Sequence, residues 1–355
     1  MKVAIVGAGV TGLSCALELE RHGIYADLFE RDNSIGWIWP SANYWPSLFY
    51  RDKGDIIEYL KSKYNIIIKP SGVCKTIMLK SPNETARING DLGYFITRGK
   101  GEDSIEQQLK RDLKRTVLCF NNNADYKRLS KEYDWVVVAT GNDAVARELE
   151  VWEEEGIARA IGGIVVGNFD PHTAYLYLNT KYAGSGYARM APFSSTQAVV
   201  SLFTIGCGEF DILKQFSAFL YNEGLTKLEF LYKMLPQPFT TGKVRKYKIG
   251  NILLAGRSAG LTERLVGVGG PEGIMSGILA ARAIAEGEDY TKQIKKIRKH
   301  IENVSSFRKV IEKFNNEDYD KLIAAIDIKG VKKIIYNTKI NHPDIIGSLL
   351  KHVTK

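Results

Sequence analysis

A glycine-rich segment near the beginning of the chain has residue types and a spacing that suit nucleotide binding. The segment is Gly7-Ala8-Gly9-Val10-Thr11-Gly12, a G-x-G-x-x-G pattern. The apolar residues 2–6 before it predict a buried strand, and residues 11–22 after it predict a helix. In such a turn the first glycine permits the tight bend, the second lets backbone amides approach a pyrophosphate, and the third allows close helix packing. We therefore expect a dinucleotide at this turn.

An acidic residue after the next predicted strand completes this pattern. Residues 25–29 are predicted as that strand, and Glu30 and Arg31 follow it. A carboxylate at this position accepts hydrogen bonds from a ribose diol and repels a 2′-phosphate, which argues against NADP. We expect both residues beside the cofactor. NAD and FAD share the ADP group, so this pattern alone does not choose between them.

Two later parts of the chain carry a resemblance that favours FAD. Residues 136–141 (Val-Val-Val-Ala-Thr-Gly) resemble the apolar strand with an Ala-Thr-Gly ending of flavoproteins that bind two dinucleotides. Residues 251–261 and 268–277 are similar to the second FAD motif of the p-hydroxybenzoate-hydroxylase-like superfamily. Within that superfamily the chain most resembles the geranylgeranyl reductase family, in which a glycine and tyrosine strand also ends in proline, as residues 186–192 do here.

The resemblance implies that FAD is the cofactor and that a second group of residues contacts it. The helix that begins near Gly273 would point its N-terminus at the flavin pyrimidine edge, where its partial positive charge stabilises the reduced ring. The glycines before this helix would let the backbone approach the ring, and a purely structural glycine-rich turn is the alternative. The implied contacts are Thr140, Gly141, Gly256, Arg257, Gly269, Gly270, Gly273 and Ile274.

Two departures from the family pattern bear on the chemistry. Arg257 follows Gly256 where the superfamily has an aspartate, so this arginine either pairs with the pyrophosphate or lies at the surface. Residues 36–40 (Gly-Trp-Ile-Trp-Pro) stand where the reductase family has a cysteine-containing segment. The sequence assigns no catalytic residue, since flavin chemistry needs few protein side chains. None of the five histidines has metal-ligand spacing, so we expect no metal site.

Aromatic residues are the candidates for a substrate pocket. Three lie in residues 33–49, which are predicted to form an irregular aromatic loop, and three lie on predicted strands of a second sheet. Rings with polar tips suit the wall of an apolar pocket, and ordinary core packing is an equal alternative for each. The six candidates are Trp37, Trp39, Trp45, Tyr175, Tyr177 and Tyr187.

The elements around these residues predict an α/β fold. We expect a Rossmann-like FAD-binding domain with an inserted, mostly antiparallel β-sheet substrate domain and a helical C-terminal tail. The FAD-binding domain is expected over residues 1–150 and 243–290, the substrate domain over 151–242 with part of 40–90, and the tail over 291–355. Further strands are predicted at 66–69, 73–79, 94–98, 134–140, 161–169, 174–178, 187–193, 198–205 and 252–255, and helices at 52–64, from about 104, and at 210–234.

Composition and charge limit the classes of function. The chain has 355 residues, of which 45% are hydrophobic and 25% charged, as in a folded protein with more than one core. The formal charge is +9, and residues 291–355 hold +8 of it. A solvated helical face is the favoured interpretation of this tail, with contact to anionic lipid as the alternative; we expect no nucleic-acid partner. Four dispersed cysteines and no membrane-spanning run predict a cytoplasmic protein, with peripheral membrane contact left open.

Three functions compete at this stage. The favoured one is an FAD-dependent oxidoreductase that reduces carbon–carbon double bonds of an apolar, isoprenoid or lipid-like substrate, with NAD(P)H or a reduced carrier protein as electron donor. The second is a flavin-dependent aromatic monooxygenase. The third is a flavin- or nucleotide-binding protein without turnover, which the arginine at position 257 makes worth testing.

Overall fold

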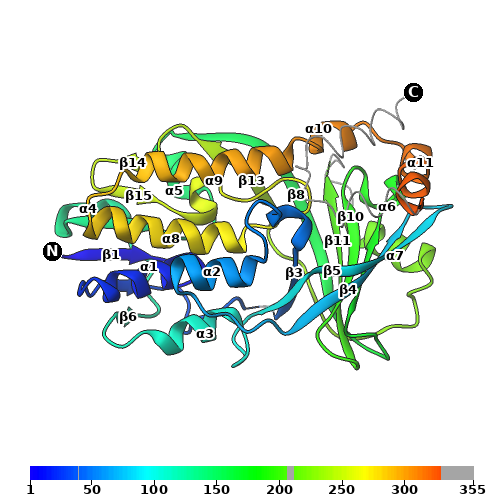
Figure 1. Cartoon of the computed structure of the whole chain (residues 1–355), viewed down its shortest axis with the longest axis horizontal. Helices are drawn as coiled ribbons and strands as arrows, with labels where there is room; N and C mark the ends of the chain where they lie inside the picture. Colours follow the sequence, from blue (N-terminus) through cyan, green and yellow to red (C-terminus); the bar gives the residue numbers. More distant parts are fainter. Residues whose placement is uncertain (39, 206–211, 329–355) are drawn as a thin grey trace.

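A parallel sheet forms the half of the molecule that contains the N-terminus (Figure 1). The computed structural model describes residues 1–38, 40–205 and 212–328. The strand order is β14-β15-β7-β1-β2-β6, and all neighbours are parallel except β14 and β15. The central strands β1 and β7 are runs of apolar residues buried on both faces, as interior strands of a parallel sheet require. The strands are β1 (Val3–Val6), β2 (Asp27–Phe29), β6 (Val117–Cys119), β7 (Trp135–Val138), β14 (Lys248–Ile249) and β15 (Ile252–Leu254).

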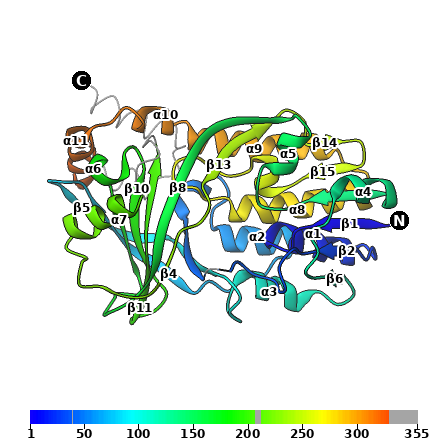
Figure 2. The ribbon, with the colours of Figure 1, turned by 180° about the vertical axis from the view of Figure 1, so that it is seen from behind.

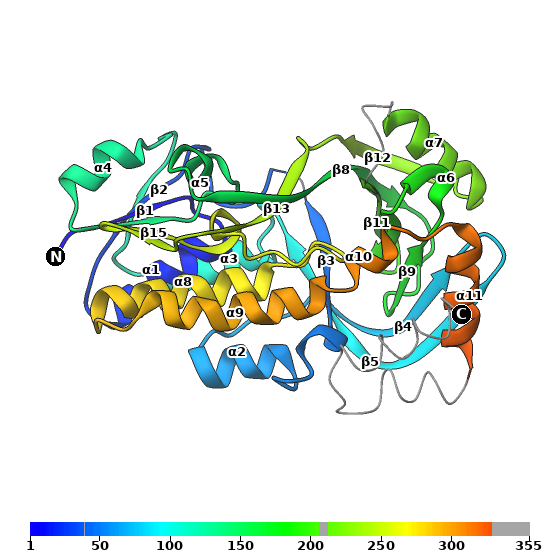
Figure 3. The ribbon, with the colours of Figure 1, turned by 90° about the horizontal axis from the view of Figure 1, so that it is seen from above.

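Helices cover both faces of this parallel sheet (Figure 3). On one face α1 (Val10–Arg21) packs against α8 (Gly270–Ala285), and α8 packs against α9 (Tyr290–Ser305) and α2 (Ile56–Tyr64). The other face carries α4 (Tyr126–Glu132) and α5 (Ala144–Glu148). The first helix follows β1 directly and α8 follows β15, so both begin at the carboxyl edge of the sheet, where open α/β sheets bind ligands.

A second, nine-stranded sheet forms the other half of the molecule (Figure 2). Its main order is β12-β8-β11-β10-β9-β4-β5-β3, and β13 also pairs with β8. Among the strands that the structure describes in this sheet, β4 and β9 alone are parallel. The 15-residue strand β8 lies wholly in this sheet, where its first half pairs with β13 and its second half with β12. The strands are β3 (Ser41–Pro46), β4 (Gly72–Lys80), β5 (Thr85–Arg98), β8 (Trp152–Val166), β9 (Thr173–Tyr177), β10 (Tyr187–Pro192), β11 (Gln197–Ile205), β12 (Glu229–Met234) and β13 (Phe239–Val244).

The two faces of the second sheet pack against different partners. One face, with Val165, Tyr177 and Leu202, is covered by α6 (Thr180–Ala183) and α7 (Ile212–Asn222). The other face, with Ile164 and Val199, packs toward residues of β3 and β5 and toward Ile323 of α11 (Asn316–Asp327). Successive residues of a strand point to opposite faces, so neighbouring positions such as Ile164 and Val165 pack on different sides of the sheet.

The predicted fold class is confirmed, and several predicted elements are wrong. Where one helix is predicted over 210–234, the described residues 212–234 hold α7 and then β12, with Gly224 in the left-handed region at φ 68° between them. Residues 33–49 are not wholly irregular, because β3 pairs there with β5. Residues 66–69 are not a strand. In the described part of the predicted tail, α9, α10 (Arg308–Ile311) and α11 confirm helical structure; the remainder, 329–355, lies outside the described residues.

Candidate cofactor site

The turn between β1 and α1 has the geometry of a pyrophosphate cradle. Gly7 has φ 104°, and a Cβ there would come within 2.5 Å of the Ala139 carbonyl oxygen. A Cβ on Gly12 would lie 2.0 Å from the Gly7 carbonyl oxygen, so the helix packs on the turn only with glycine there. A Cβ on Gly9, by contrast, would meet no protein atom within 4 Å. Gly9 is also the N-cap of α1, and no side chain caps that helix end. The open space at Gly9 therefore faces uncapped backbone amides.

Glu30 ties this turn to the second strand. Its Oε2 accepts a hydrogen bond from the Ala8 amide at 2.9 Å, and its Oε1 accepts from the Asp32 amide at 3.0 Å. The Gly7 amide donates to the Phe29 carbonyl oxygen at 2.8 Å. The carboxylate thus lies beside the glycine-rich turn, as the sequence predicts. Arg31 lies differently, since its side chain is 64% exposed and its Nε is 3.9 Å from Asp32.

The first turn of α8 meets the first turn of α1 through glycines. A Cβ on Gly273 would lie 2.7 Å from Thr11 Oγ1, and one on Gly256 would lie 2.4 Å from the same atom. The Gly256 amide donates to Ser276 Oγ at 2.9 Å, which holds the turn after β15 against α8. Like α1, α8 begins at a glycine, Gly269, that provides no side-chain cap. The N-termini of α1 and α8 thus lie close together, and neither has a side-chain cap. Both helix ends favour negative charge.

Of the other predicted cofactor contacts, some lie near the two helix N-termini and Arg257 turns away from them. Gly141 has φ 72° and open space around it, and Thr140 Oγ1 lies 3.0 Å from Ser258 Oγ next to Arg257. Ile274 is fully buried in α8. The Arg257 guanidinium turns toward β13, where Nη2 donates to the Thr240 carbonyl oxygen at 3.3 Å and the group lies 4.8 Å from the Phe239 ring centroid. Arg257 thus contacts β13 and not the glycine-rich turn, and its half-buried position does not match the surface alternative either.

Trp45 is the aromatic residue of the 33–49 segment that lies at this site. Its indole is 2% exposed, and a Cβ on Gly270 would come within 2.7 Å of it, so the indole covers the beginning of α8. Trp37 is 45% exposed and joins Ile38 as a surface apolar residue. Trp39 lies outside the described residues.

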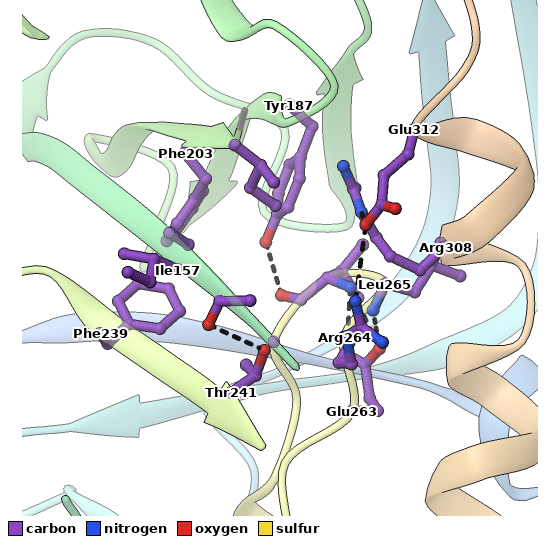
Figure 4. Close-up of a pocket in the computed structure, with 15 residues that line it drawn as sticks. Ile157, Tyr187, Phe203, Phe239, Thr241, Glu263, Arg264, Leu265, Arg308 and Glu312 are labelled. Atoms are coloured by element: carbon purple, nitrogen blue, oxygen red, sulfur yellow. Dashed lines mark hydrogen bonds and ion pairs between the residues drawn. The ribbon is translucent and has the colours of Figure 1, made fainter. Parts of the chain in front are cut away.

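Tyr187 lines a small cavity between the second sheet and the loop that leads into α8 (Figure 4). Its hydroxyl donates to the Val266 carbonyl oxygen at 2.6 Å, and its ring stacks on Phe203 with centroids 4.9 Å apart. The cavity has a volume of about 40 Å³, which is room for a few water molecules. Ile157, Phe203 and Phe239 supply apolar walls, and Arg308 and Glu312 of the C-terminal helices close another side.

Tyr175 and Tyr177 do not join Tyr187. In the register of β9 and β10 they pair with Met190 and Ala188, which point to the opposite face from Tyr187. Their rings stack on each other at 6.3 Å, and Tyr177 meets Phe219 of α7 edge-on at 5.4 Å. These two tyrosines belong to the core under α7 and do not line the cavity.

Two buried glutamates, which sequence reasoning did not single out, flank the cavity loop and α8. Glu263 is 4% exposed and accepts hydrogen bonds from the amides of Leu265, Val266 and Val268, which fixes the loop. Burial raises its pKa to about 7, against the effect of these amide donors. Glu272, in the first turn of α8, is 2% exposed, and burial likewise raises its pKa to about 7. The sequence signal for Glu272 was a single carboxylate in a predicted helix of otherwise mostly small and apolar residues.

The described residues fit FAD by this geometry. Gly9 leaves open space at an uncapped helix end, Glu30 is fixed beside it, and the glycines of α8 give a second uncapped end close by. A dinucleotide whose pyrophosphate meets α1 and whose ring system meets α8 satisfies both.

Comparison with known proteins defines the class. Residues 2–66 match the family described as FAD dependent oxidoreductase. The chain is an FAD-dependent oxidoreductase with FAD as its cofactor, so the predicted enzyme class and cofactor are confirmed, and a binding protein without turnover is set aside.

The most informative relatives are reductases. The chain is 24% identical to digeranylgeranylglycerophospholipid reductase 2 of Methanothermobacter thermautotrophicus over 379 aligned residues, with 94% of this chain and 93% of the relative covered. A geranylgeranyl bacteriochlorophyll reductase-like structure from Thermoplasma acidophilum has the same fold, with a TM-score of 0.70, 16% identity and coverage of 99% and 98%. The p-nitrophenol 4-monooxygenase of Pseudomonas putida also shares the fold, with a TM-score of 0.63, 14% identity and coverage of 98% and 97%. The resemblance to geranylgeranyl reductases is thus confirmed, and no helix of the described chain is long and apolar enough to span a bilayer.

Proposed function

We propose that this oxidoreductase reduces carbon–carbon double bonds of an apolar, isoprenoid or lipid-like substrate. The observation that carries the proposal is the alignment with a lipid reductase over nearly the whole length of both chains. It is supported by the position of the cavity at Tyr187, which adjoins the loop leading into α8 and is lined mostly by apolar side chains.

Each part of the proposed cofactor site has a separate task. The amides at the start of α1 bind the pyrophosphate, Glu30 accepts hydrogen bonds from the ribose, and the first turn of α8 lies against the flavin. When bound, FAD supplies the hydride chemistry. Trp45 covers the beginning of α8 and excludes water from it. In this proposal residues 1–150 and 243–290 hold the cofactor, and residues 151–242 with part of 40–90 hold the substrate.

The cavity at Tyr187 must widen to take an isoprenoid chain. Its volume of about 40 Å³ is far below the few hundred Å³ of ordinary ligand pockets. The side formed by α10 depends on polar contacts, since Arg308 Nη2 donates to the Ser185 carbonyl oxygen at 2.7 Å and Arg264 pairs with Glu312 at 3.6 Å. Movement of α10 would therefore enlarge the cavity while the sheet stays fixed.

A donor of either class named above, NAD(P)H or a reduced carrier protein, would deliver electrons to the flavin. Lysines of α9 lie on the exposed side of that helix, as the alternation of exposed and buried residues in it indicates. They would bring the protein to anionic lipid surfaces without insertion.

The test is reduction of a prenyl lipid by the FAD-loaded protein with dithionite as reductant. The proposal expects products heavier by one hydrogen molecule for each double bond reduced, found by mass spectrometry. Oxygen uptake stimulated by a phenol, with no change in prenyl lipids, would instead support the aromatic monooxygenase. If the protein shows neither activity, the substrate class proposed here has no support.

A further inference from the structure

A row of polar side chains connects the protein surface with the buried first turn of α8. Asp52, whose side chain is 53% exposed, pairs with Lys53 at 2.8 Å. Lys53 Nζ lies 3.4 Å from His300 Nδ1 on α9, and His300 Nε2 lies 3.9 Å from Glu272 Oε1. Glu272 thus has a polar route to solvent although its own side chain is 3% exposed.

From Lys53 inward, each group of this row can donate a hydrogen bond to the next group toward Glu272. An ammonium group has hydrogen-bond donors and no acceptor, so Lys53 donates and His300 Nδ1 accepts. Burial, together with the Lys53 ammonium, lowers the pKa of His300 to about 4, so the ring is neutral near pH 7. A neutral imidazole that accepts at Nδ1 carries its proton on Nε2, which is the atom that faces Glu272. A shift of about 1 Å would turn that contact into a hydrogen bond.

The surroundings of Glu272 favour a carboxyl group that changes charge. Tyr50 Oη donates to Glu272 Oε2 at 3.2 Å, and the Tyr50 ring stacks on His300 with centroids 5.7 Å apart. Lys53 favours the ionised form, whereas burial and the nearby Glu263 favour the protonated form. These opposed effects bring the pKa of Glu272 to about 7, so it gains or loses a proton near neutral pH.

We propose that Glu272 takes up a proton through Lys53 and His300 when electrons enter the flavin at the N-terminus of α8. The inference rests on the proposed position of the flavin. Electrons pass from the reductant to the flavin, and the added negative charge raises the proton affinity of the adjacent carboxylate. The O–H bond at Glu272 would form as the Nε2–H bond of His300 breaks, and His300 Nδ1 would take a proton from the Lys53 ammonium. Solvent would return a proton to Lys53, so the charge added by reduction would be balanced within the protein.

The experiment is a measurement of flavin midpoint potential against pH in the FAD-loaded protein. An additional proton per two electrons makes the reduction equilibrium fall a further tenfold for each pH unit, or about 30 mV. Wild type should show this additional slope above about pH 7, where Glu272 is ionised in the oxidised protein. Glu272→Gln should lose it, whereas the control Glu286→Gln, at the other end of α8 and 44% exposed, should keep it.

Two more variants separate the relay from a structural role. His300→Gln should keep the slope but slow proton uptake, measured with a pH indicator in stopped flow, by roughly tenfold or more. Tyr50→Phe removes the donor to Glu272 and should move the additional slope to higher pH, which gives a result even if Glu272→Gln does not fold.

The outcomes distinguish the relay from the cofactor site. An unchanged slope in FAD-loaded Glu272→Gln, or normal proton uptake in His300→Gln, overturns the relay while FAD binding stands. A wild-type protein that takes up no FAD overturns the cofactor assignment instead. A flavin-free readout is also available, because nitrogen NMR of labelled histidines should show His300 as the Nε2–H tautomer.

Discussion

Thr11 of α1 and Gly273 of α8 lie so close that a methyl group on the glycine would come within 2.7 Å of the threonine Oγ1. This contact joins two helix N-termini that follow different strands and are separated by more than 250 residues in the sequence. Because both helix ends lack side-chain caps, together they form one electropositive surface that suits a dinucleotide. The position of α8 against Thr11 therefore depends on the absence of a side chain at Gly273.

Gly273→Ala tests this packing. The added methyl must displace Thr11 or tilt α8, at a cost of about 1 to 3 kcal/mol in the free energy of unfolding. Flavin affinity should fall as well, measured by fluorescence on titration with FAD. Gly101→Ala is the control, since a Cβ there meets no atom within 4 Å. Equal affinity in wild type and Gly273→Ala would show that the α1 and α8 contact does not shape the site.

Tyr187→Phe tests the cavity. Loss of the hydrogen bond to the Val266 carbonyl oxygen frees the loop before α8, and the rate of substrate reduction should fall roughly tenfold, equivalent to one hydrogen bond of about 1.4 kcal/mol. FAD content should be unchanged. Tyr177→Phe, on the opposite face of the same sheet, should leave the rate as in wild type. A larger loss for Tyr177→Phe than for Tyr187→Phe would contradict the assignment of faces.

Glu272 should make stability depend on pH. Its pKa is about 7 in the folded protein and near its ordinary value of 4.5 in the unfolded chain, so the folded state binds more protons between these values. The contribution of this carboxyl to stability is thus greatest below about pH 4.5 and is lost as pH rises to about 7. Glu272→Gln should remove about 3 kcal/mol of this decline, measured by urea unfolding at several pH values. Parallel curves for wild type and variant would count against the buried titration.

The nucleotide turn could be predicted from sequence because its signals are local. The glycines at 7, 9 and 12 and the acid at 30 lie within a single strand, helix and strand unit, and their roles follow from backbone geometry. The resemblance of residues 251–277 pointed to the turn and helix start that the structure places against α1. The inserted sheet was also expected, because its β-rich runs alternate with turns.

The remainder depended on tertiary contacts. The strand β3 was hidden because Trp45 and Pro46 gave the segment the composition of a loop, while pairing with β5 is decided elsewhere in the chain. Tyr175 and Tyr177 were grouped with Tyr187 because composition does not reveal which face of a sheet a residue occupies. The row from Lys53 through His300 to Glu272 joins three separate elements, so no spacing in the sequence indicates it.

The most direct test of the cofactor site is the FAD content and affinity of Gly9→Ala beside wild type. At this position a methyl group meets no protein atom within 4 Å, so the melting temperature should hardly change, with a cost of at most about 1 kcal/mol at the helix end. The same methyl occupies the space assigned to the pyrophosphate, so FAD affinity should fall by roughly 100-fold, or about 3 kcal/mol. Wild type with bound FAD and a folded, colourless Gly9→Ala is the predicted result. A variant that binds FAD as tightly as wild type would contradict the site.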